Sequence, residues 1–478
     1  MPTTCIRNAA WIIAWDPSTA RHGYLRNADL AFGADRILFI GRRYPGPVDN
    51  EIDGTDRMVM PGLVDIHAHP STEPLFRGLR EEHGLPSMFM TGLYERGVAF
   101  RPDAPARHAA KTVAYAELLL SGTTAVADLS GIDQGWIELA ARSGLRVFAA
   151  PSFASAHWHL ENHWQLRYAW DEAAGRAGLD AALTLIEQAQ ADPSGRLSGI
   201  VSPAQIDTCT ADLLRDSHAA ALERNLPFTT HCSQSINEFN EMTGRHGITP
   251  VQWANQLGIL GRNTILGHAI FIDQHAWTRW HTTRDLPLLA ETETNVAHCP
   301  SPFARYGQTL EHFGRYRRAG VNLGIGTDVA PHNLIEEIRL AATLGRIAAQ
   351  DITATSLNDV FHAATAGGAQ ALGRTDIGRL QPGAKADMVV VDLTNPWMMP
   401  AHDPLRSLVY TAADRAIEQV FIDGRLVVDR GKVLTLDHAG ALAALTEAQG
   451  RMIAAVPSHD WAHRDADRIT PRSLPMLT

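Results

Sequence analysis

Cysteine is scarce in this chain, and long apolar runs are missing. The four cysteines, Cys5, Cys209, Cys232 and Cys299, are scattered and form no Cys-x-x-Cys pair. They argue against a disulfide framework and against a cysteine-based structural zinc site. No apolar run approaches the roughly 18 residues that span a bilayer, and the first residues lack the pattern of a signal peptide. We therefore expect a cytoplasmic protein that does not insert into a membrane.

Basic clusters are missing as well. The chain has 42 Lys and Arg against 52 Asp and Glu, a formal net charge of −10, without any basic run. Nucleic acid is therefore not expected as a partner, because its phosphates need a positive surface. What remains is a chain of 478 residues, 45% of them hydrophobic, which can bury a large core and exceeds the usual size of one domain.

The middle of the chain alternates between short apolar runs and longer segments of helical periodicity. This alternation predicts parallel strands joined by crossover helices. We expect eight strands, at residues 59–66, 123–127, 146–150, 198–201, 227–230, 264–267, 294–297 and 321–326. Helices are expected at 103–121, 137–143, 334–349 and 356–372. Eight strands close a (β/α)8 barrel, so the predicted fold class is α/β with a TIM-like barrel.

Both ends of the chain consist instead of short strand patterns and turns. Each end alone would leave an apolar face exposed, so we predict one small β-sandwich domain built from both termini. Residues 1–59 and 380–435 would be its two parts, 60–379 the barrel catalytic domain, and 436–478 a C-terminal tail.

The strongest chemical signal is a His-x-His pair at the end of the first predicted barrel strand. Residues 61–69 read Pro-Gly-Leu-Val-Asp-Ile-His-Ala-His, which ends in His67 and His69. Side chains at i and i+2 of a strand point to the same side, so both imidazoles can face one point. Such a pair alone is weak evidence for a metal site, because two histidines at a strand end can be purely structural.

Four more residues of ligand type follow other predicted strands. They are His231, His268, His298 and Asp328. The C-terminal ends of barrel strands form one face, where active sites lie, so these side chains should converge although they are far apart in sequence. A single buried histidine usually satisfies a neighbour's hydrogen bond, but that reading does not explain so many at equivalent positions.

The pattern resembles the amidohydrolase superfamily, in particular its cytosine deaminase-like and triazine hydrolase-like branch. The matching segments are 61–69, Arg77-Gly78, 121–124, 298–300, 326–328 and 380–387. The resemblance implies that His67, His69, His231 and Asp328 hold a divalent metal, and that His268 lies beside the water or the substrate. It makes His298 a substrate contact, and His83 in the loop after the first strand is another candidate.

Three imidazoles and a carboxylate suit zinc, while iron, manganese or cobalt also accept such ligands. The binuclear relatives carry a bridging lysine at the end of the fourth strand, and this chain has none at residues 200–203. We therefore expect one metal, which activates water. Asp328 would accept the proton of that water, and His268 would stabilise the oxyanion.

One departure from the family bears on the substrate. Relatives that deaminate rings usually carry Glu three residues after the third histidine, and this chain has Gln234 there. An amide can bind substrate but cannot carry a proton. Glu238 and Glu241 are expected to belong to the next helix. A second departure is the segment 299–307, whose Phe303, Arg305 and Tyr306 replace an Asn-containing stretch.

These departures favour hydrolysis of an acyclic C–N bond in an amide, urea or carbamate-like small molecule, as in the phenylurea and molinate hydrolases. The alternative is an aminohydrolase or chlorohydrolase of a nitrogen heterocycle such as a triazine, pyrimidine or purine. A third reading is an inactive homologue that still binds metal. Relatives are often dimeric or larger, so a homo-oligomer is also expected.

Overall fold

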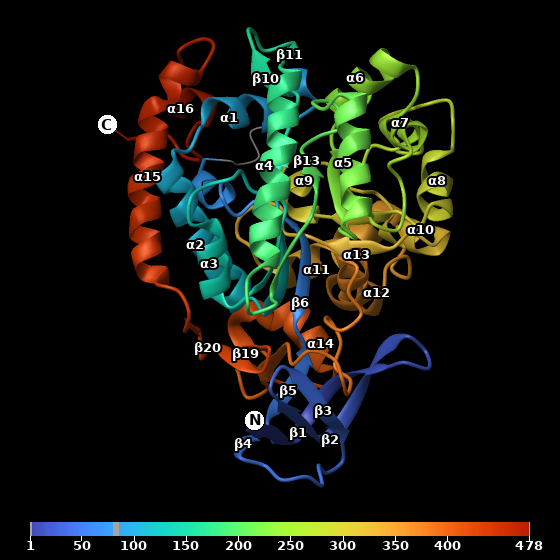
Figure 1. Ribbon diagram of the computed structural model, residues 1–478, viewed down its shortest axis with the longest axis vertical. Coiled ribbons are helices and arrows are strands. Elements are labelled where there is room, and N and C mark those ends of the chain that lie inside the picture. The colour runs from blue at the N-terminus through green and yellow to red at the C-terminus, as the bar shows by residue number, and fades with distance from the viewer. Residues whose placement is uncertain (1, 80–85, 478) are drawn as a thin grey trace.

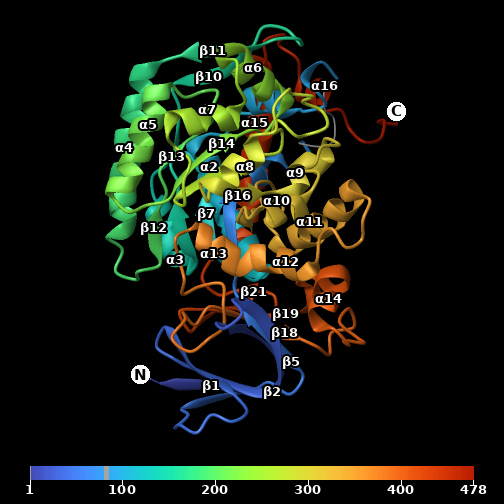
Figure 2. The same ribbon diagram turned by 90° about the vertical axis from the view of Figure 1, so that its right-hand side faces the viewer.

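The computed structural model describes residues 2–79 and 86–477. It has a sheet domain at one end and a larger α/β domain above it (Figures 1 and 2). The N-terminal strands of the sheet are β1 (Thr3–Asp16), β2 (Arg21–Gly33), β3 (Arg36–Gly41), β4 (Asn50–Asp53) and β5 (Arg57–Pro61). The C-terminal strands are β18 (Met388–Asp392), β19 (Ile417–Ile422), β20 (Arg425–Asp429) and β21 (Lys432–Val433). Both chain ends therefore build this domain.

Hydrogen bonds join these strands into one nine-stranded sheet, in the order β21-β20-β19-β18-β5-β1-β2-β3 with β4 beside β1. β5 and β18, one from each terminus, pair directly and antiparallel. The sheet folds back on itself, because Phe32 of β2 and Phe421 of β19 lie four positions apart in this order and yet contact each other, with ring centroids 5.5 Å apart. Apolar side chains from both termini, such as Ile12, Val59 and Val390, are buried together on this sheet.

The α/β domain contains eight parallel strands in two four-stranded sheets. The first sheet has the order β12-β8-β7-β6, with β6 (Leu63–Ala68), β7 (Thr123–Asp128), β8 (Arg146–Ala149) and β12 (Leu197–Gly199). The second has the order β14-β15-β16-β17, with β14 (Phe228–Cys232), β15 (Thr264–His268), β16 (Asn295–His298) and β17 (Leu323–Ile325). Isolated parallel bridges, Ala68 to Asp328 and Val201 to Phe228, connect the two sheets.

All eight predicted barrel strands overlap observed ones, with one correction. The predicted strand 59–66 is two strands that separate at Gly62. Residues up to Pro61 pair with β18 in the terminal sheet, whereas Leu63 begins a strand that pairs in parallel with β7. Both strands are buried, so their residues form one continuous apolar run, and the sequence pattern does not show where the pairing partner changes.

Helices alternate with the strands and surround them. They are α2 (Ala104–Leu120), α3 (Trp136–Ser143), α4 (Glu172–Gln190), α5 (Ala211–Glu223), α6 (Ile236–His246), α7 (Pro250–Leu257), α8 (Asp285–Glu291), α9 (Pro300–Arg305), α10 (Phe313–Ala319), α11 (Leu334–Ala349), α12 (Leu357–His362) and α13 (Gly368–Ala371). The predicted helix 356–372 is interrupted by a π-helical turn, Ala363–Gly367. Asp103 caps α2 by accepting the Ala106 N–H, as expected for an N-terminal aspartate.

Shorter elements complete the chain. Before α2 lie the turns η1 (Glu73–Phe76) and η2 (Pro86–Met88) and the helix α1 (Leu93–Ala99). β9 (Ser152–Phe153) pairs with β13 (Ser202–Pro203), and β10 (Ala156–Leu160) forms a hairpin with β11 (Leu166–Trp170). Near the terminal sheet lie α14 (Pro404–Ser407), η4 (Leu408–Ala412) and η5 (Ala413–Ala416). The hairpin lies at the end of the molecule opposite the terminal sheet (Figure 1).

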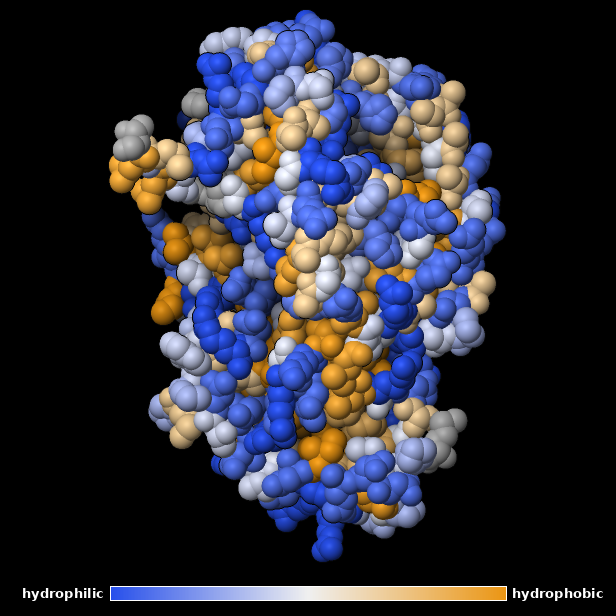
Figure 3. Space-filling view, turned by 90° about the vertical axis from the view of Figure 1, so that its left-hand side faces the viewer, coloured by the Kyte–Doolittle hydropathy of each residue, from blue (hydrophilic) through white to orange (hydrophobic). Residues whose placement is uncertain are grey.

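The segment expected to be a tail contains helices α15 (His438–His459) and α16 (Ala466–Ile469). α15 lies along α2, and Leu445 and Met452 join Val113 in a buried cluster. The last residues project from this side of the molecule, where Figure 3 shows hydrophobic side chains at the projecting end. Leu474, Met476 and Leu477 are exposed there. Within the described residues, no helix is long and apolar enough to cross a membrane.

Candidate metal centre and active site

Four side chains converge at the C-terminal ends of the parallel strands. His67 lies in β6 and His69 follows it, His231 lies in β14, and Asp328 follows β17. One ligand atom from each of these residues lies within 4.8 Å of the others. The structure thus brings together the four residues predicted as metal ligands from positions up to 261 residues apart. His268, the last residue of β15, lies beside them.

The ring nitrogens of this cluster are oriented by backbone carbonyls. His69 Nδ1 lies 2.9 Å from the Leu129 oxygen, and His231 Nδ1 lies 2.7 Å from the Ala204 oxygen. A carbonyl only accepts, so both Nδ1 atoms carry a proton and both Nε2 atoms present lone pairs. These Nε2 atoms face one another at 3.2 Å. Two facing lone pairs repel, and a cation between them removes the repulsion, so the residues present fit a divalent metal.

The carboxylate of Asp328 completes the cluster. Its Oδ1 lies 3.2 Å from His69 Nε2 and 3.5 Å from His67 Nε2, and its Oδ2 lies 3.8 Å from His268 Nε2. Burial raises the pKa of Asp328, but the neighbouring histidines outweigh burial and hold that pKa well below its usual value. Asp328 is therefore a carboxylate, able to bind a metal and to accept a proton.

Asp65 fixes the backbone at two of the predicted ligands, His67 and Asp328. Sequence reasoning missed this role. The Asp65 carboxylate accepts the His67 N–H at 3.0 Å, and from Thr327 it accepts the N–H at 3.2 Å and the hydroxyl at 2.7 Å. Thr327 precedes Asp328, whose φ of +58° is a left-handed conformation that costs non-glycine residues free energy. The sequence feature that could have identified Asp65 is that it is an aspartate inside an otherwise apolar strand.

His268 is placed to act on a reacting group. Its φ is +102°, a conformation that side-chain-bearing residues rarely adopt. Burial lowers the pKa of His268 to about 3, so the imidazole is neutral at pH 7. Its ring also contacts Phe303, with centroids 4.7 Å apart. A neutral imidazole can donate one hydrogen bond, as a group that stabilises an oxyanion must.

A cavity of about 440 Å³ opens onto the cluster. His69, His231, His268 and Asp328 lie in its wall. The rest of the wall is partly apolar, with Phe76, Leu93, Phe100, Pro102, Phe303, Tyr306 and Val329. This size and composition suit a small organic molecule held by few polar contacts.

Gln234 lines this cavity together with Gln205. The Gln234 amide Nε2 donates to Gln205 Oε1. The two predicted glutamates, Glu238 and Glu241, belong to α6 as expected. Glu238 accepts the N–H groups of Ser233 and Gln234, the latter at 3.1 Å, so it holds the loop and is not part of the cavity wall.

Glu73 is a cavity residue that sequence reasoning missed. It is buried, lies four residues after His69 in η1, and lines the same cavity. Burial lowers the pKa of His69, but the Asp328 carboxylate, the Leu129 carbonyl and the Glu73 charge outweigh it and raise that pKa. The only sequence signal for Glu73 was its position four residues after His69.

One predicted substrate contact, His298, lies outside the cavity wall. His298 ends β16, is buried, and packs against Phe313 with ring centroids 5.7 Å apart. It is not among the described residues that line the cavity. His83 lies outside the described residues. Cys299, next to His298, lies within 4.8 Å of His268 and Asp328, and burial raises its pKa well above the usual value, so it is a thiol.

Relatives named as deaminases of adenosine-type nucleosides match this chain over most of its length. A 5-methylthioadenosine/S-adenosylhomocysteine deaminase of Natronomonas pharaonis is 29% identical over 424 residues, covering 87% of this chain and 92% of the relative. A 5'-deoxyadenosine deaminase of Methanothermobacter thermautotrophicus is 27% identical over 432 residues, covering 89% and 95%.

Solved structures are similar over most of the chain. The adenosine deaminase of Xanthomonas campestris with bound zinc has a TM-score of 0.80 at 24% identity, covering 94% of this chain and 98% of that one. The zinc-bound atrazine chlorohydrolase of Arthrobacter aurescens has a TM-score of 0.81 at 23% identity, covering 93% and 100%. At these identities the likeness shows the fold.

A family model described as the amidohydrolase family matches residues 58–427. The match includes every strand that carries a predicted ligand. The chain therefore belongs to the amidohydrolase family and is a hydrolase that acts on carbon–nitrogen bonds.

Proposed function

We propose that this enzyme is a metal-dependent aminohydrolase that removes an amino group from a nitrogen heterocycle. The observation that carries the proposal is the cluster of His67, His69, His231 and Asp328 at the floor of a cavity of about 440 Å³. Relatives named as adenosine-type deaminases match this chain over nearly its whole length and favour a ring substrate. We therefore place the heterocycle ahead of the acyclic amides, ureas and carbamates that the sequence favoured.

One divalent ion, with zinc as the first choice, would be held by these four side chains. When bound, it supplies activated water and polarises the bond under attack. Asp328 would accept a proton from the attacking water, because its carboxylate is ionised. His268 would donate a hydrogen bond to the negative charge that develops on the substrate. The ring carbon gains a hydroxyl group and the amino group leaves as ammonia.

Gln205 and Gln234 would hold the substrate edge. Their mutual hydrogen bond uses one amide N–H of Gln234 and the carbonyl of Gln205. The Gln234 carbonyl then remains as an acceptor and the Gln205 amide as a donor. An amino-heterocycle presents the complement, an exocyclic N–H beside a ring nitrogen. Gln234 would thus orient the substrate without carrying a proton.

Glu73 would carry the proton that Gln234 cannot. A carboxyl group ionises and an amide does not, and Glu73 lines the cavity on the side of His69. In this arrangement the family's proton carrier has moved from the loop after β14 to the loop after β6. The missing glutamate at residue 234 therefore does not exclude ring deamination.

We also propose that the eight parallel strands close into one (β/α)8 barrel over residues 60–379. The two bridges that connect the four-stranded sheets support this. Residues 1–59 and 380–435 would then be the terminal sheet domain, and 436–478 an appendage. The exposed Leu474, Met476 and Leu477 are apolar enough to be covered in a homo-oligomer.

The second candidate function is hydrolysis of an acyclic C–N bond, which Gln234 favours because an acyclic amide needs no protonation of a ring nitrogen. Ammonia release separates the two. The metal-loaded enzyme would be assayed with 5'-deoxyadenosine, adenosine and amino-triazines, and in parallel with anilides, phenylureas and carbamates. Ammonia from a heterocycle supports the proposal, and an amine released only from the acyclic compounds overturns it. No turnover by fully metal-loaded protein would indicate an inactive homologue.

A further inference from the structure

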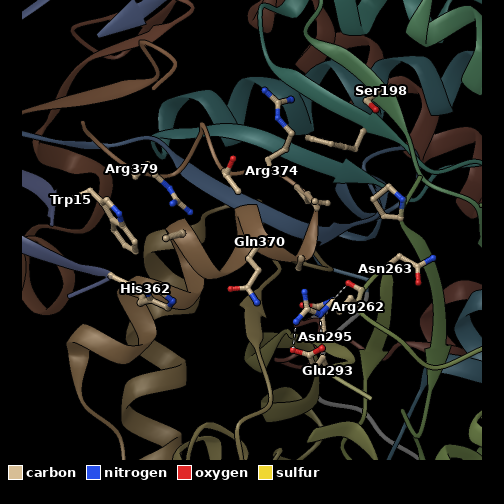
Figure 4. Close-up of a pocket in the computed structure, with 18 of the residues that line it drawn as sticks. Trp15, Ser198, Arg262, Asn263, Glu293, Asn295, His362, Gln370, Arg374 and Arg379 are labelled. Atoms are coloured by element: carbon tan, nitrogen blue, oxygen red, sulfur yellow. Dashed lines mark hydrogen bonds and ion pairs between the residues drawn. The ribbon is translucent and has the colours of Figure 1, made fainter. Parts of the chain in front are cut away.

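A second, larger cavity lies at the opposite ends of the strands from the metal centre. Its volume is about 970 Å³. Its wall includes Asn263, directly before β15, and Asn295, the first residue of β16 (Figure 4). His268 ends β15 on the other side, so roughly 13 Å of strand separates the two sites. The cavity is thus distinct from the active site.

Both domains contribute to this second cavity. The terminal sheet supplies Trp15 from β1 and Arg21 and His22 from β2, while the α/β domain supplies Arg317 from α10 and His362 from α12. Figure 4 shows Trp15, His362 and Arg379 together on one side of the cavity and the pair Arg262–Glu293 on another. A ligand that contacts both Arg21 and Arg317 would bridge the two domains.

Positive charge is concentrated in this wall, although the chain as a whole carries a net charge of −10. Five arginines and two carboxylates line the cavity: Arg21, Arg262, Arg317, Arg374, Arg379, Glu293 and Asp359. Burial lowers the pKa of His22 to about 3 and that of His362 to about 4, so both imidazoles are neutral at pH 7. The wall therefore has an excess of three positive charges.

Both carboxylates already have partners. Glu293 is bound by Arg262 through two hydrogen bonds, and Asp359 accepts the Ser356 hydroxyl at 2.6 Å. Arg374 is likewise held by Asp376 through two hydrogen bonds. The remaining arginines, Arg21, Arg317 and Arg379, make no ion pair with the residues that the structure describes.

These three arginines line the same cavity. Burial lowers the pKa of His362, another residue of this wall, and the charges of Arg317, Arg379 and Arg21 lower it further, whereas the Asp359 carboxylate raises it. The Nε atoms of Arg317 and Arg379 are buried without a hydrogen-bond partner in the described part of the chain, and so is Nδ1 of His22. Buried donors of this kind normally have partners, so this group is incomplete without an acceptor.

We propose that this cavity binds an anionic small molecule through a phosphate group, held by Arg317, Arg379 and Arg21. Arginine forks bind phosphate oxygens through paired, charge-assisted hydrogen bonds, and these three arginines have no acidic partner among the described residues. Arg379 is held in place by Trp15, with its guanidinium carbon 4.5 Å from the ring centroid. The proposal is independent of the reaction catalysed at the metal centre.

The test is calorimetric titration of the full metal-loaded chain with glycerol 3-phosphate, and with succinate at equal ionic strength. We expect saturable binding of about one glycerol 3-phosphate per chain. Arg317→Met and Arg379→Met should each weaken it roughly tenfold to a hundredfold, since each removes a charged hydrogen bond. Arg374→Met is the matched control, because Asp376 already holds that arginine, and it should change the affinity less than threefold.

A metal-site variant, His67→Ala, separates this cavity from the active site. Binding that persists in His67→Ala and is lost in Arg317→Met supports the proposal. Binding lost in His67→Ala but retained in the arginine variants would overturn it, as would tighter binding of succinate than of the phosphate. Circular dichroism of each variant would show that it is folded, and Arg317→Lys should recover part of the affinity.

Discussion

Asp65 provides a sharp test of how the metal centre is held. Its carboxylate accepts hydrogen bonds from His67 and Thr327, neighbours of the cluster on two different strands. Three such bonds to a charged acceptor are worth roughly 4 to 9 kcal/mol before costs. Burial opposes this and is the larger effect on the pKa of Asp65, which is raised from 3.8 to about 7 despite these hydrogen bonds. Asp65→Ala leaves the His67 N–H and the Thr327 N–H and hydroxyl without this acceptor, so we expect it to lower the free energy of unfolding by about 2 to 4 kcal/mol.

Metal binding should weaken as well. Groups that orient metal ligands typically change metal affinity by roughly 10- to 100-fold. We expect Asp65→Ala to weaken metal binding by that factor, and Asp65→Asn by less, because one amide oxygen can still accept the His67 and Thr327 N–H groups. The assay is metal titration of the demetallated protein against a competing chelator, at a temperature where each variant is folded.

Asp285 is the matched control. It is equally buried and accepts hydrogen bonds from Thr249, Gln252 and the Asp273 N–H, far along the chain from the ligands. Asp285→Ala should cost similar stability and leave metal affinity unchanged. Equal metal affinity in Asp65→Ala and in the unmodified protein would refute the reasoning, since Asp65 would then contribute only to folding.

Three further predictions concern single residues. Glu73→Gln should lower kcat by roughly 100-fold or more in the ammonia-release assay, the usual effect of removing a proton carrier, whereas a matched change of the buried Glu337, which lies outside the cavity wall, should not. Gln234→Glu should lower turnover of amino-heterocycles in the same assay, because a carboxylate cannot donate to Gln205, and raised turnover would show instead that the enzyme lacks a proton carrier at residue 234. Burial lowers the pKa of His298 from 6.5 to about 3, so stability that is full above pH 6.5 is lost as the pH falls. By pH 5 this loss is about 2 kcal/mol, and urea titrations of His298→Asn at pH 5 and 7.5 should not show it.

The convergence of the four candidate ligands could be predicted because local sequence carries it. Each ligand ends or follows a strand, and parallel strands bring their C-terminal ends to one face, so position along a strand predicts position in space. His67, His231 and Asp328 needed no further information. The same rule placed His298 among the substrate contacts, but strand position does not fix the direction of a side chain, and its ring packs against Phe313.

Other features depend on contacts between distant segments. The strand break at Gly62 follows from the pairing of β5 with β18, more than 300 residues later, which no local pattern reveals. The arginine cavity likewise combines Arg21, Arg317 and Arg379 from separate elements. Helix α15 is rich in alanine and has only a narrow apolar stripe, so its sequence periodicity is weak. Its packing against α2 stabilises the helix, and that contact cannot be predicted from local sequence.

The most direct test of the account is the metal content of the purified protein, measured by mass spectrometry beside its rate of ammonia release. We predict about one divalent metal per chain in the unmodified enzyme, and less than about a tenth of that in His231→Ala, with activity lost in proportion. Ammonia release that persists after the metal has been removed, or an unchanged metal content in His231→Ala, would contradict the assignment of these four side chains as the metal centre.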